Sequence, residues 1–191
     1  MSLTHLLAEV RACTACAEHL PHGVRPVFQA GAGAGVVIIG QAPGRRVHES
    51  GVPWDDPSGV RLRQWLDIDE DTFYDPESVA LLPMGFCYPG TGASGDLPPR
   101  PECAPLWHER ILAHLRAGAL RVVIGTYAQE RYLPDRSDTL TATVERWREY
   151  LPETIPLPHP SPRNQRWLRR NPWFEDEVVP ALQERVAQAV A

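Results

Sequence analysis

The sequence predicts an α/β fold in which helices cover both faces of a parallel β-sheet. Short apolar runs bounded by turn residues recur along the chain, and helical patterns with apolar residues three or four positions apart separate them. Strands that alternate with helices usually form parallel β-α-β units, because a parallel pair needs a crossover connection. The chain has 191 residues, 43% of them hydrophobic, and shows no internal repeat. It is therefore long enough to bury a full core, and we expect one domain over residues 1–191.

The predicted elements follow one another in this order. The first helix, at 2–17, has an apolar face formed by Leu3, Leu6, Leu7, Val10 and Cys13. Four apolar runs predict strands, at 36–40, 79–83, 121–125 and 154–157. Other helical patterns occupy 58–66, 101–117, 127–133 and 139–150. A last helix begins after Asn171 and Pro172, and Pro180 is expected to kink or split it.

An unusual turn follows each of the four predicted strands. The turns read GQAPG at 40–44, MGFCYPGTG at 84–92, GTYAQ at 125–129 and PHPSPRN at 158–164. Parallel sheets bind their ligands beyond the carboxyl ends of the strands. We therefore expect these four turns to meet at one site.

Charge and hydropathy narrow the class of protein. The net charge of −5 argues against a generally basic nucleic-acid coat. A local basic segment is nevertheless formed by Arg163, Arg166, Arg169 and Arg170, either as a nucleic-acid contact or as a solvated helix surface. No apolar stretch approaches the length of a membrane span, and Glu9 and Arg11 interrupt the N-terminal apolar residues. We therefore expect a cytoplasmic protein with no membrane partner.

The four cysteines are the strongest chemical signal in the sequence. They are Cys13, Cys16, Cys87 and Cys103, spaced as C-x2-C, a long gap and C-x15-C. Disulfides would suit an exported protein, and nothing in the sequence indicates export. A zinc ribbon usually has two close pairs, whereas the second pair here is wide. An iron–sulfur cluster tolerates irregular spacing, since thiolates from separate loops can converge on it. By spacing alone, the cluster, zinc and unrelated buried thiols all remain open.

Taken in order, these motifs resemble the uracil-DNA glycosylase superfamily, specifically its iron–sulfur families four and five. The C-x2-C helix, the GQAPG turn, the C-x15-C loop and HPSPRN follow one another over nearly the whole chain. The resemblance implies a three-layer α/β/α sandwich with a four-stranded, mainly parallel central sheet. It implies a 4Fe-4S cluster bound by Cys13, Cys16, Cys87 and Cys103. It also implies a monomeric enzyme of base excision repair whose partner is damaged DNA.

The chemistry of such an enzyme sets three requirements. Breaking an N-glycosidic bond builds positive charge on the deoxyribose and negative charge on the base, so a carboxylate near the sugar and a donor near the base are needed. The base must also leave the helical stack and enter a pocket with an aromatic face. The resemblance assigns the donor to His159 and the wedge that opens the duplex to Pro160, Ser161, Pro162 and Arg163, with Ser161 on a phosphate. A histidine that only fixes a proline-rich loop is the alternative for His159.

Trp54 and the carboxylate complete the predicted site. Trp54 takes the place of the ring that stacks on the flipped base in family four, although it could be a core residue. Family four usually has glutamate at Gln41 and an acidic pair at positions 47 and 48, so its expected carboxylates are absent. The DPSG stretch at 56–59 resembles the acidic stretch of family five, which makes Asp56 the first candidate and Asp55 the second. Asp56 is equally suited to cap a helix. His48 is a candidate auxiliary that positions water.

The base that this pocket takes is less defined. Family four reads uracil with an asparagine at the position of Pro83, and no amide side chain occurs at 83–85. A pocket without that reader does not reject other bases, so hypoxanthine and xanthine join uracil as candidates. Backbone groups at 83–86 are an alternative reader. The other predicted pocket residues are Gly40, Gln41, Ala42, Pro43, Gly44, Ser58, Gly85, Phe86, Ser161 and Asn164.

Two further expectations concern activity. The pocket motifs contain no lysine for Schiff-base chemistry, which predicts a monofunctional glycosylase. The departures from family four leave a catalytically silent iron–sulfur nucleic-acid-binding protein as the alternative, and a zinc-stabilised nucleotide-binding module as a third hypothesis.

Overall fold

Four parallel strands form the centre of the computed structural model, which describes residues 2–191. In the order of the sheet they are β2 (Val79–Leu81), β1 (Val36–Ile39), β5 (Leu120–Ile124) and β6 (Thr154–Leu157). Every residue of these strands except Arg121 is buried, as expected for a parallel sheet that is covered on both sides. All four predicted strands are therefore confirmed.

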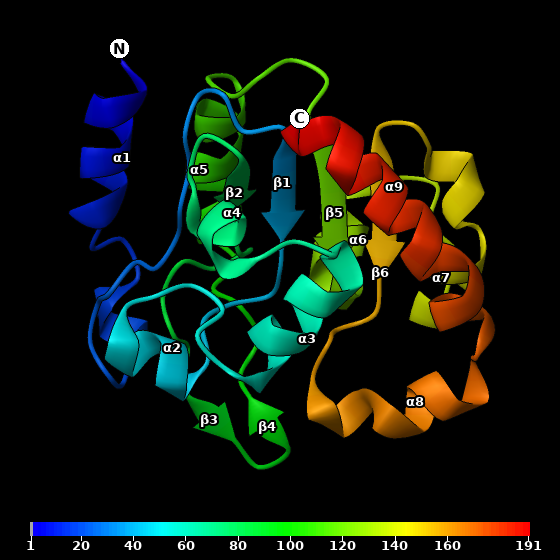
Figure 1. Cartoon of the computed structure of the whole chain (residues 1–191). Helices are drawn as coiled ribbons and strands as arrows, with labels where there is room; N and C mark the ends of the chain where they lie inside the picture. The colour runs from blue at the N-terminus through cyan, green and yellow to red at the C-terminus, as the bar shows by residue number, and fades with distance from the viewer. Residues whose placement is uncertain (1) are drawn as a thin grey trace.

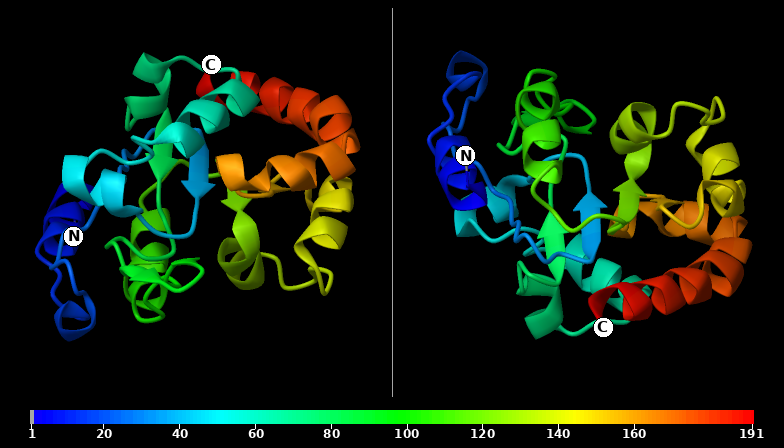
Figure 2. Two further views of the ribbon diagram at one scale, coloured as in Figure 1. Left: turned by 90° about the horizontal axis from the view of Figure 1, so that it is seen from below. Right: turned by 90° about the horizontal axis from the view of Figure 1, so that it is seen from above.

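Helices pack on both faces of this sheet (Figure 2). One face carries α3 (Pro57–Leu66), α4 (Glu70–Tyr74), α7 (Leu140–Glu145), α8 (Gln165–Arg170) and α9 (Val179–Val190). The other carries α1 (Leu3–Arg11), α5 (Cys103–Leu112) and α6 (Gly125–Tyr132). Successive strand residues alternate between the two cores: Val36 and Ile38 belong to one, Val37 and Ile39 to the other. The predicted three-layer α/β/α sandwich is confirmed.

Several helices are shorter than their sequence patterns predicted. The first ends at Arg11 instead of 17, so Cys13 and Cys16 lie in the turn that follows it. The helix predicted at 101–117 covers only Cys103–Leu112, and that at 139–150 divides into α7 and a 3-10 turn, Trp147–Tyr150. Apolar periodicity continues through such turns because they also pack on the core. A π-helical turn, Phe174–Val178, precedes α9, and Pro180 lies in the first turn of α9.

Short elements that the sequence did not reveal gather at the carboxyl edge of the sheet (Figure 1). They are α2 (Arg45–Ser50), the hairpin of β3 (Thr91–Gly92) and β4 (Gly95–Asp96), and the 3-10 turn Pro162–Asn164 before α8. Elements this short carry little periodicity and depend on tertiary contacts. Among residues 2–191, no helix combines the length and apolar character that crossing a bilayer requires.

His108 joins α5 to the loop after β2 and to α6. It is fully buried, its Nε2 donates to the Pro83 carbonyl over 3.0 Å, and its Nδ1 accepts from the Tyr132 hydroxyl at 2.6 Å. Burial lowers the pKa of His108 to about 4, since the interior disfavours the charged imidazolium. The folded protein therefore holds this histidine neutral.

This burial makes folding stability depend on pH. The unfolded chain takes up a proton at the ordinary histidine pKa, whereas folded His108 resists protonation down to about pH 4. Above the ordinary histidine pKa, His108 does not make the free energy of unfolding depend on pH. Between that value and about pH 4, each unit of acidification lowers the free energy of unfolding by up to about 1.4 kcal/mol. Urea unfolding between pH 7.5 and pH 4.5 should show a shallower loss in His108→Gln than in the parent. An identical slope in the parent and in His108→Gln would contradict the assignment. His5→Gln, at an exposed position, is the control.

Candidate active site

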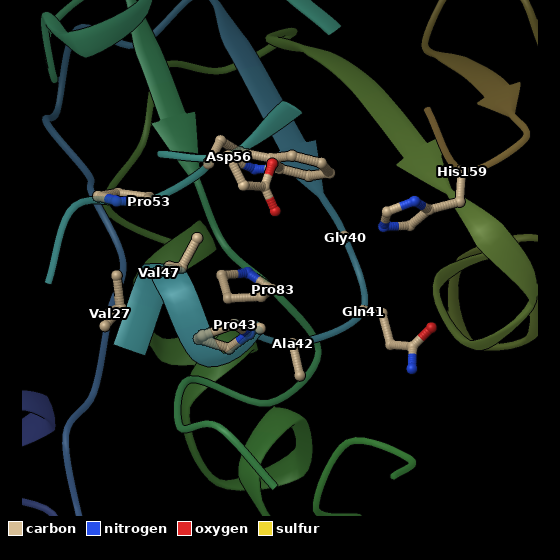
Figure 3. A pocket seen from close by; sticks show the side chains of 12 residues that line it. Val27, Gly40, Gln41, Ala42, Pro43, Val47, Pro53, Asp56, Pro83 and His159 are labelled. Atoms are coloured by element: carbon tan, nitrogen blue, oxygen red, sulfur yellow. The ribbon is translucent and has the colours of Figure 1, made fainter. Parts of the chain in front are cut away.

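A pocket opens at the carboxyl end of β1 and encloses about 430 Å³ of empty space, part of it open to solvent (Figure 3). It brings together much of the predicted site. The lining residues are Val27, Gly40, Gln41, Ala42, Pro43, Gly44, Val47, Pro53, Trp54, Asp56, Pro83 and His159. The GQAPG turn, the WDDPSG stretch and the HPSPRN loop therefore meet here. The predicted turns at 84–92 and 125–129 contribute no lining residue, so two of the four expected turns form the pocket.

The GQAPG turn forms one wall of this pocket. Met84 and Gly85 donate their N–H groups to the carbonyls of Gly40 and Gln41 over 2.8 and 3.0 Å, which fixes the loop after β2 against the turn. The N–H groups of Gln41 and Ala42 have no acceptor within residues 2–191. Two backbone donors on pocket-lining residues are thus available to a bound ligand.

Trp54 lies across the turn in an uncommon conformation. Its φ is 58°, a left-handed value that is rare for a bulky residue. The ring passes so close to Gly40 that a Cβ there would lie 2.8 Å from its Cζ2 atom. On the other side, the ring centroids of Trp54 and His159 are 5.8 Å apart at 30°. Strain of this kind is typical of a residue whose side chain is held for function.

Asp56 enters the pocket from the start of α3. It is the N-cap of that helix, with Oδ1 accepting the Gly59 N–H at 2.9 Å and Pro57 in the first helical position. Both interpretations of the DPSG stretch are therefore compatible with its geometry, because the capping residue also lines the pocket. Asp55 does not line it; the Asp55 N–H donates to the Val52 carbonyl at 3.3 Å.

His159 enters the pocket from the loop after β6 (Figure 3). The Ser161 N–H donates to its Nδ1 at 3.2 Å, so in the neutral ring the proton is on Nε2. Burial lowers the pKa of His159, while the carboxylates of Asp56 and Asp96 act in the opposite direction. The result is a neutral imidazole with one N–H to donate. Asn164 holds the loop in place by donating to the His159 carbonyl at 2.7 Å.

Some predicted residues lie elsewhere. Ser161 and Asn164 support His159 and are not among the pocket-lining residues, and Ser58 is buried in α3. His48 lies beside Tyr88, with ring centroids 5.7 Å apart, and does not line the pocket. The His48 ring thus packs against a residue outside α2, a contact that the helix by itself does not determine.

The expected backbone reader at 83–86 is largely engaged within the protein. The Pro83 carbonyl accepts from His108, and the N–H groups of Met84 and Gly85 bond to the GQAPG turn. The Phe86 N–H donates to Cys103 Sγ at 3.3 Å. No N–H in this stretch is therefore left to donate to a base, which limits the predicted backbone readers to carbonyl oxygens.

The predicted DNA-binding loop is held by a residue that the sequence did not single out. Arg61, on α3, donates to the Ser161 carbonyl at 3.3 Å and to Gln165 Oε1 at 3.0 Å. Pro162 and Arg163 are exposed, whereas Pro160 is buried. Exposed arginines on the same edge of the sheet are Arg45 and Arg46 on α2 and Arg166, Arg169 and Arg170 on α8 (Figure 1). Two elements at this edge of the sheet, α2 and α8, thus carry exposed positive charge.

All four cysteines line a second cavity, bordered by α1, α5 and the loop after β2. None is in a disulfide. Burial raises the pKa of Cys103 to about 12; the Phe86 N–H acts in the opposite direction, and the neighbouring thiols add to the rise. Burial also raises the pKa of Cys87 to about 11. Within residues 2–191, no three His, Cys, Asp or Glu side chains are arranged to hold a single metal ion. The four thiols face one space without forming a closed single-ion site.

The donor set of this cavity is four thiols, and cysteine thiolates are the usual ligands of iron–sulfur clusters. Each cysteine of a cubane binds a different iron, so its sulfurs stand farther apart than the ligands of one ion. Trp107, one turn after Cys103, also lines the cavity, and its buried Nε1 has no acceptor within the described residues. A buried indole N–H normally finds a partner. Thiolate or sulfide sulfur in the cavity would provide one.

The family of the chain follows from a comparison with known proteins. The model of the uracil DNA glycosylase superfamily matches residues 28–183. The match begins after Cys13 and Cys16. It covers the GQAPG turn, the WDDPSG stretch and the HPSPRN loop, which contribute to the pocket. By this match, and by a four-stranded parallel sheet with its pocket at the carboxyl edge, the chain belongs to the uracil DNA glycosylase superfamily.

Proposed function

We propose that this protein is a monofunctional DNA glycosylase that hydrolyses the N-glycosidic bond of a flipped, deaminated base during base excision repair. The observation that carries the proposal is the meeting of Trp54, Asp56 and His159 in one pocket. These side chains supply the three things that the reaction requires: an aromatic face, a carboxylate and a hydrogen-bond donor. The exposed arginines on α2 and α8, at the same edge of the sheet, suit contact with a DNA backbone.

The base leaves as an anion, and the pocket offers donors to stabilise it. His159 donates from Nε2 because its Nδ1 accepts from Ser161. The N–H groups of Gln41 and Ala42 are free to donate as well. Donors fixed in advance stabilise charge that appears only in the transition state, at no cost of reorganisation.

The sugar becomes cationic as the bond breaks, and Asp56 supplies the opposing charge. Its Oδ1 is held by the Gly59 N–H, which keeps the carboxylate in one orientation. Trp54 stacks on the flipped base and excludes water from that face. Arg61 links the two halves of this site, since it belongs to the helix capped by Asp56 and holds the loop that carries His159.

The chemistry of the chain favours a hydrolase over a lyase. All 19 basic residues other than histidine are arginines, so no lysine side chain is available for a Schiff base. With the N–H groups at 83–86 engaged, Gln41 is the one amide side chain among the lining residues. Keto bases such as uracil, hypoxanthine and xanthine are the substrates we propose.

The direct test is a panel of duplex oligonucleotides that contain uracil, hypoxanthine or xanthine at one position. After incubation, alkali cleaves the strand wherever a base has been removed. Cleavage of at least one of the three supports the proposal. Tight binding of a damaged duplex with no cleavage of any would favour a silent nucleic-acid-binding protein.

We further propose that Cys13, Cys16, Cys87 and Cys103 bind a 4Fe-4S cluster, as in the iron–sulfur branches of the superfamily. Such a cluster, when bound, would cross-link three separate segments of the chain. The cavity that the four cysteines share and the buried Trp107 N–H, which has no acceptor within residues 2–191, support this assignment. The segments also reach the pocket: Val27, a lining residue, donates its N–H to the Phe86 carbonyl at 2.7 Å.

Iron content tests this proposal. Protein purified without oxygen should be brown, with about four irons per chain. Cys87→Ala and Cys103→Ala should bleach the protein and lower its melting temperature, because the cluster cross-links the fold. Iron analysis, visible absorbance and thermal unfolding provide the measurements. Stoichiometric zinc without iron would contradict the cluster.

Loss of the donor at His159 should slow catalysis more than it weakens binding. In His159→Ala, single-turnover cleavage should fall by about a hundredfold to a thousandfold, since the donor acts on transition-state charge. The Kd for DNA with a tetrahydrofuran abasic site should change much less. Because neutral His159 has a lowered pKa, cleavage by the parent should not weaken until the pH is below the ordinary histidine value. Unchanged cleavage with weakened binding would make His159 a structural residue.

Asp56 variants separate chemistry from helix capping. Asp56→Asn keeps an oxygen that can accept the Gly59 N–H, so folding should survive while cleavage falls by roughly two orders of magnitude. Asp56→Ala should lose activity and also about 1 kcal/mol of stability, the usual cost of a lost cap. Asp55→Asn, outside the pocket lining, is the matched control and should change neither. Near-normal cleavage by well-folded Asp56→Asn would reduce Asp56 to a helix cap.

A further inference from the structure

A second carboxylate, Asp96, lies beside the pocket-lining Gly44 without being a lining residue itself, on an element that the sequence did not predict. Asp96 ends the β3–β4 hairpin, which lies between Cys87 and Cys103 in the chain and pairs Thr91 with Asp96. The hairpin projects at the carboxyl edge of the sheet, next to α2 (Figure 1). Asp96 is exposed and takes part in no ion pair within residues 2–191.

The Asp96 side chain is oriented by its neighbours. The Thr91 hydroxyl donates to Asp96 Oδ1 at 3.4 Å, and Thr91 in turn bonds to the buried Tyr88. The other oxygen, Oδ2, is so near the pocket wall that a Cβ on Gly44 would lie 3.4 Å from it. One oxygen is thus anchored, and the other faces the pocket-lining turn.

The hairpin also meets the loop that carries His159. A Cβ on Gly95 would lie 3.1 Å from Nη1 of Arg163. Asp96 and Asp56 both act on the pKa of His159 through their charge. The two carboxylates come from different elements: Asp56 lines the pocket, and Asp96 Oδ2 lies beside the pocket-lining Gly44.

An exposed carboxylate beside a site for a polyanion needs an explanation. Near phosphates it weakens binding by repulsion, and the same edge of the sheet carries exposed arginines. Its charge is useful only where the reaction places a cation or a water molecule, and both occur at the sugar. Asp56 and Asp96 each have one oxygen that accepts a hydrogen bond, and Asp96 is the more exposed of the two.

From this geometry we propose that Asp96 is a second catalytic carboxylate, which holds the attacking water and faces the cationic sugar, while Asp56 remains ionised as the electrostatic partner. The inference rests on the glycosylase activity proposed above. In the step, the C1′–N bond breaks and its electron pair leaves with the base, stabilised by His159. The water oxygen bonds to C1′ as its proton passes to Asp96. That proton then passes to the released base or to solvent, which restores the carboxylate.

Two DNA probes test this role independently of the base. One duplex carries a pyrrolidine, a cationic mimic of the sugar, and the other carries the neutral tetrahydrofuran. The parent should bind the pyrrolidine duplex more tightly, and Asp96→Asn should reduce this preference by about tenfold. Its Kd for the tetrahydrofuran duplex should stay the same or fall, because a negative charge beside the pocket has been removed. Asp71→Asn, an exposed position on α4, is the control for the loss of one charge.

Single-turnover cleavage of the best base in the panel completes the test. Asp96→Asn should cleave about a hundredfold more slowly at an unchanged melting temperature. Equal weakening of both probe duplexes would mean a structural role for the hairpin and would overturn the inference, as would a parent with no preference for the cation. Normal cleavage and preference in Asp96→Asn would overturn it too. Cleavage by the parent of none of the three bases, with the cation preference intact, would instead refute the proposed substrates.

Discussion

The pocket depends on the close contact between Trp54 and two glycines. Gly40 leaves room for the ring, and Gly59 leaves room for the backbone, since a Cβ at Gly59 would lie 1.8 Å from the Trp54 carbonyl oxygen. These contacts hold Trp54 in a left-handed conformation, and the chain that leaves it reaches Asp56 at the start of α3. One tightly packed crossing thus sets both the aromatic face and the position of the carboxylate.

The candidate pocket and the cysteine cavity are lined by residues that are neighbours in the chain. Val27 and Pro83 line the first, while Pro26 and Phe86 line the second. His108 fixes the Pro83 carbonyl from α5, the helix that begins at Cys103. The backbone that borders the cysteine cavity is thus hydrogen-bonded to residues that line the pocket.

Charge is distributed in a way that suits a reaction on DNA. The net charge is −5, yet exposed arginines lie on α2 and α8 at one edge of the sheet, where they can meet phosphates. At the same edge, Asp56 and Asp96 bring negative charge to the neighbourhood of His159. In the proposed reaction, attraction for the DNA backbone and stabilisation of a sugar cation would thus come from different residues.

The sequence by itself determined the four strands and their parallel arrangement, because apolar periodicity and turn residues are local signals. It also brought the GQAPG turn and the HPSPRN loop to one site, since parallel strands share a carboxyl edge. It also pointed to Trp54, Asp56 and His159, through motifs in which residue type and spacing carry the chemistry. Only the tertiary structure decided that Ser161 and Asn164 support His159 and that the N–H groups at 83–86 are engaged. It alone brought Arg61 and Asp96 to the site, since contacts between residues far apart in the chain leave no periodic or local trace in the sequence.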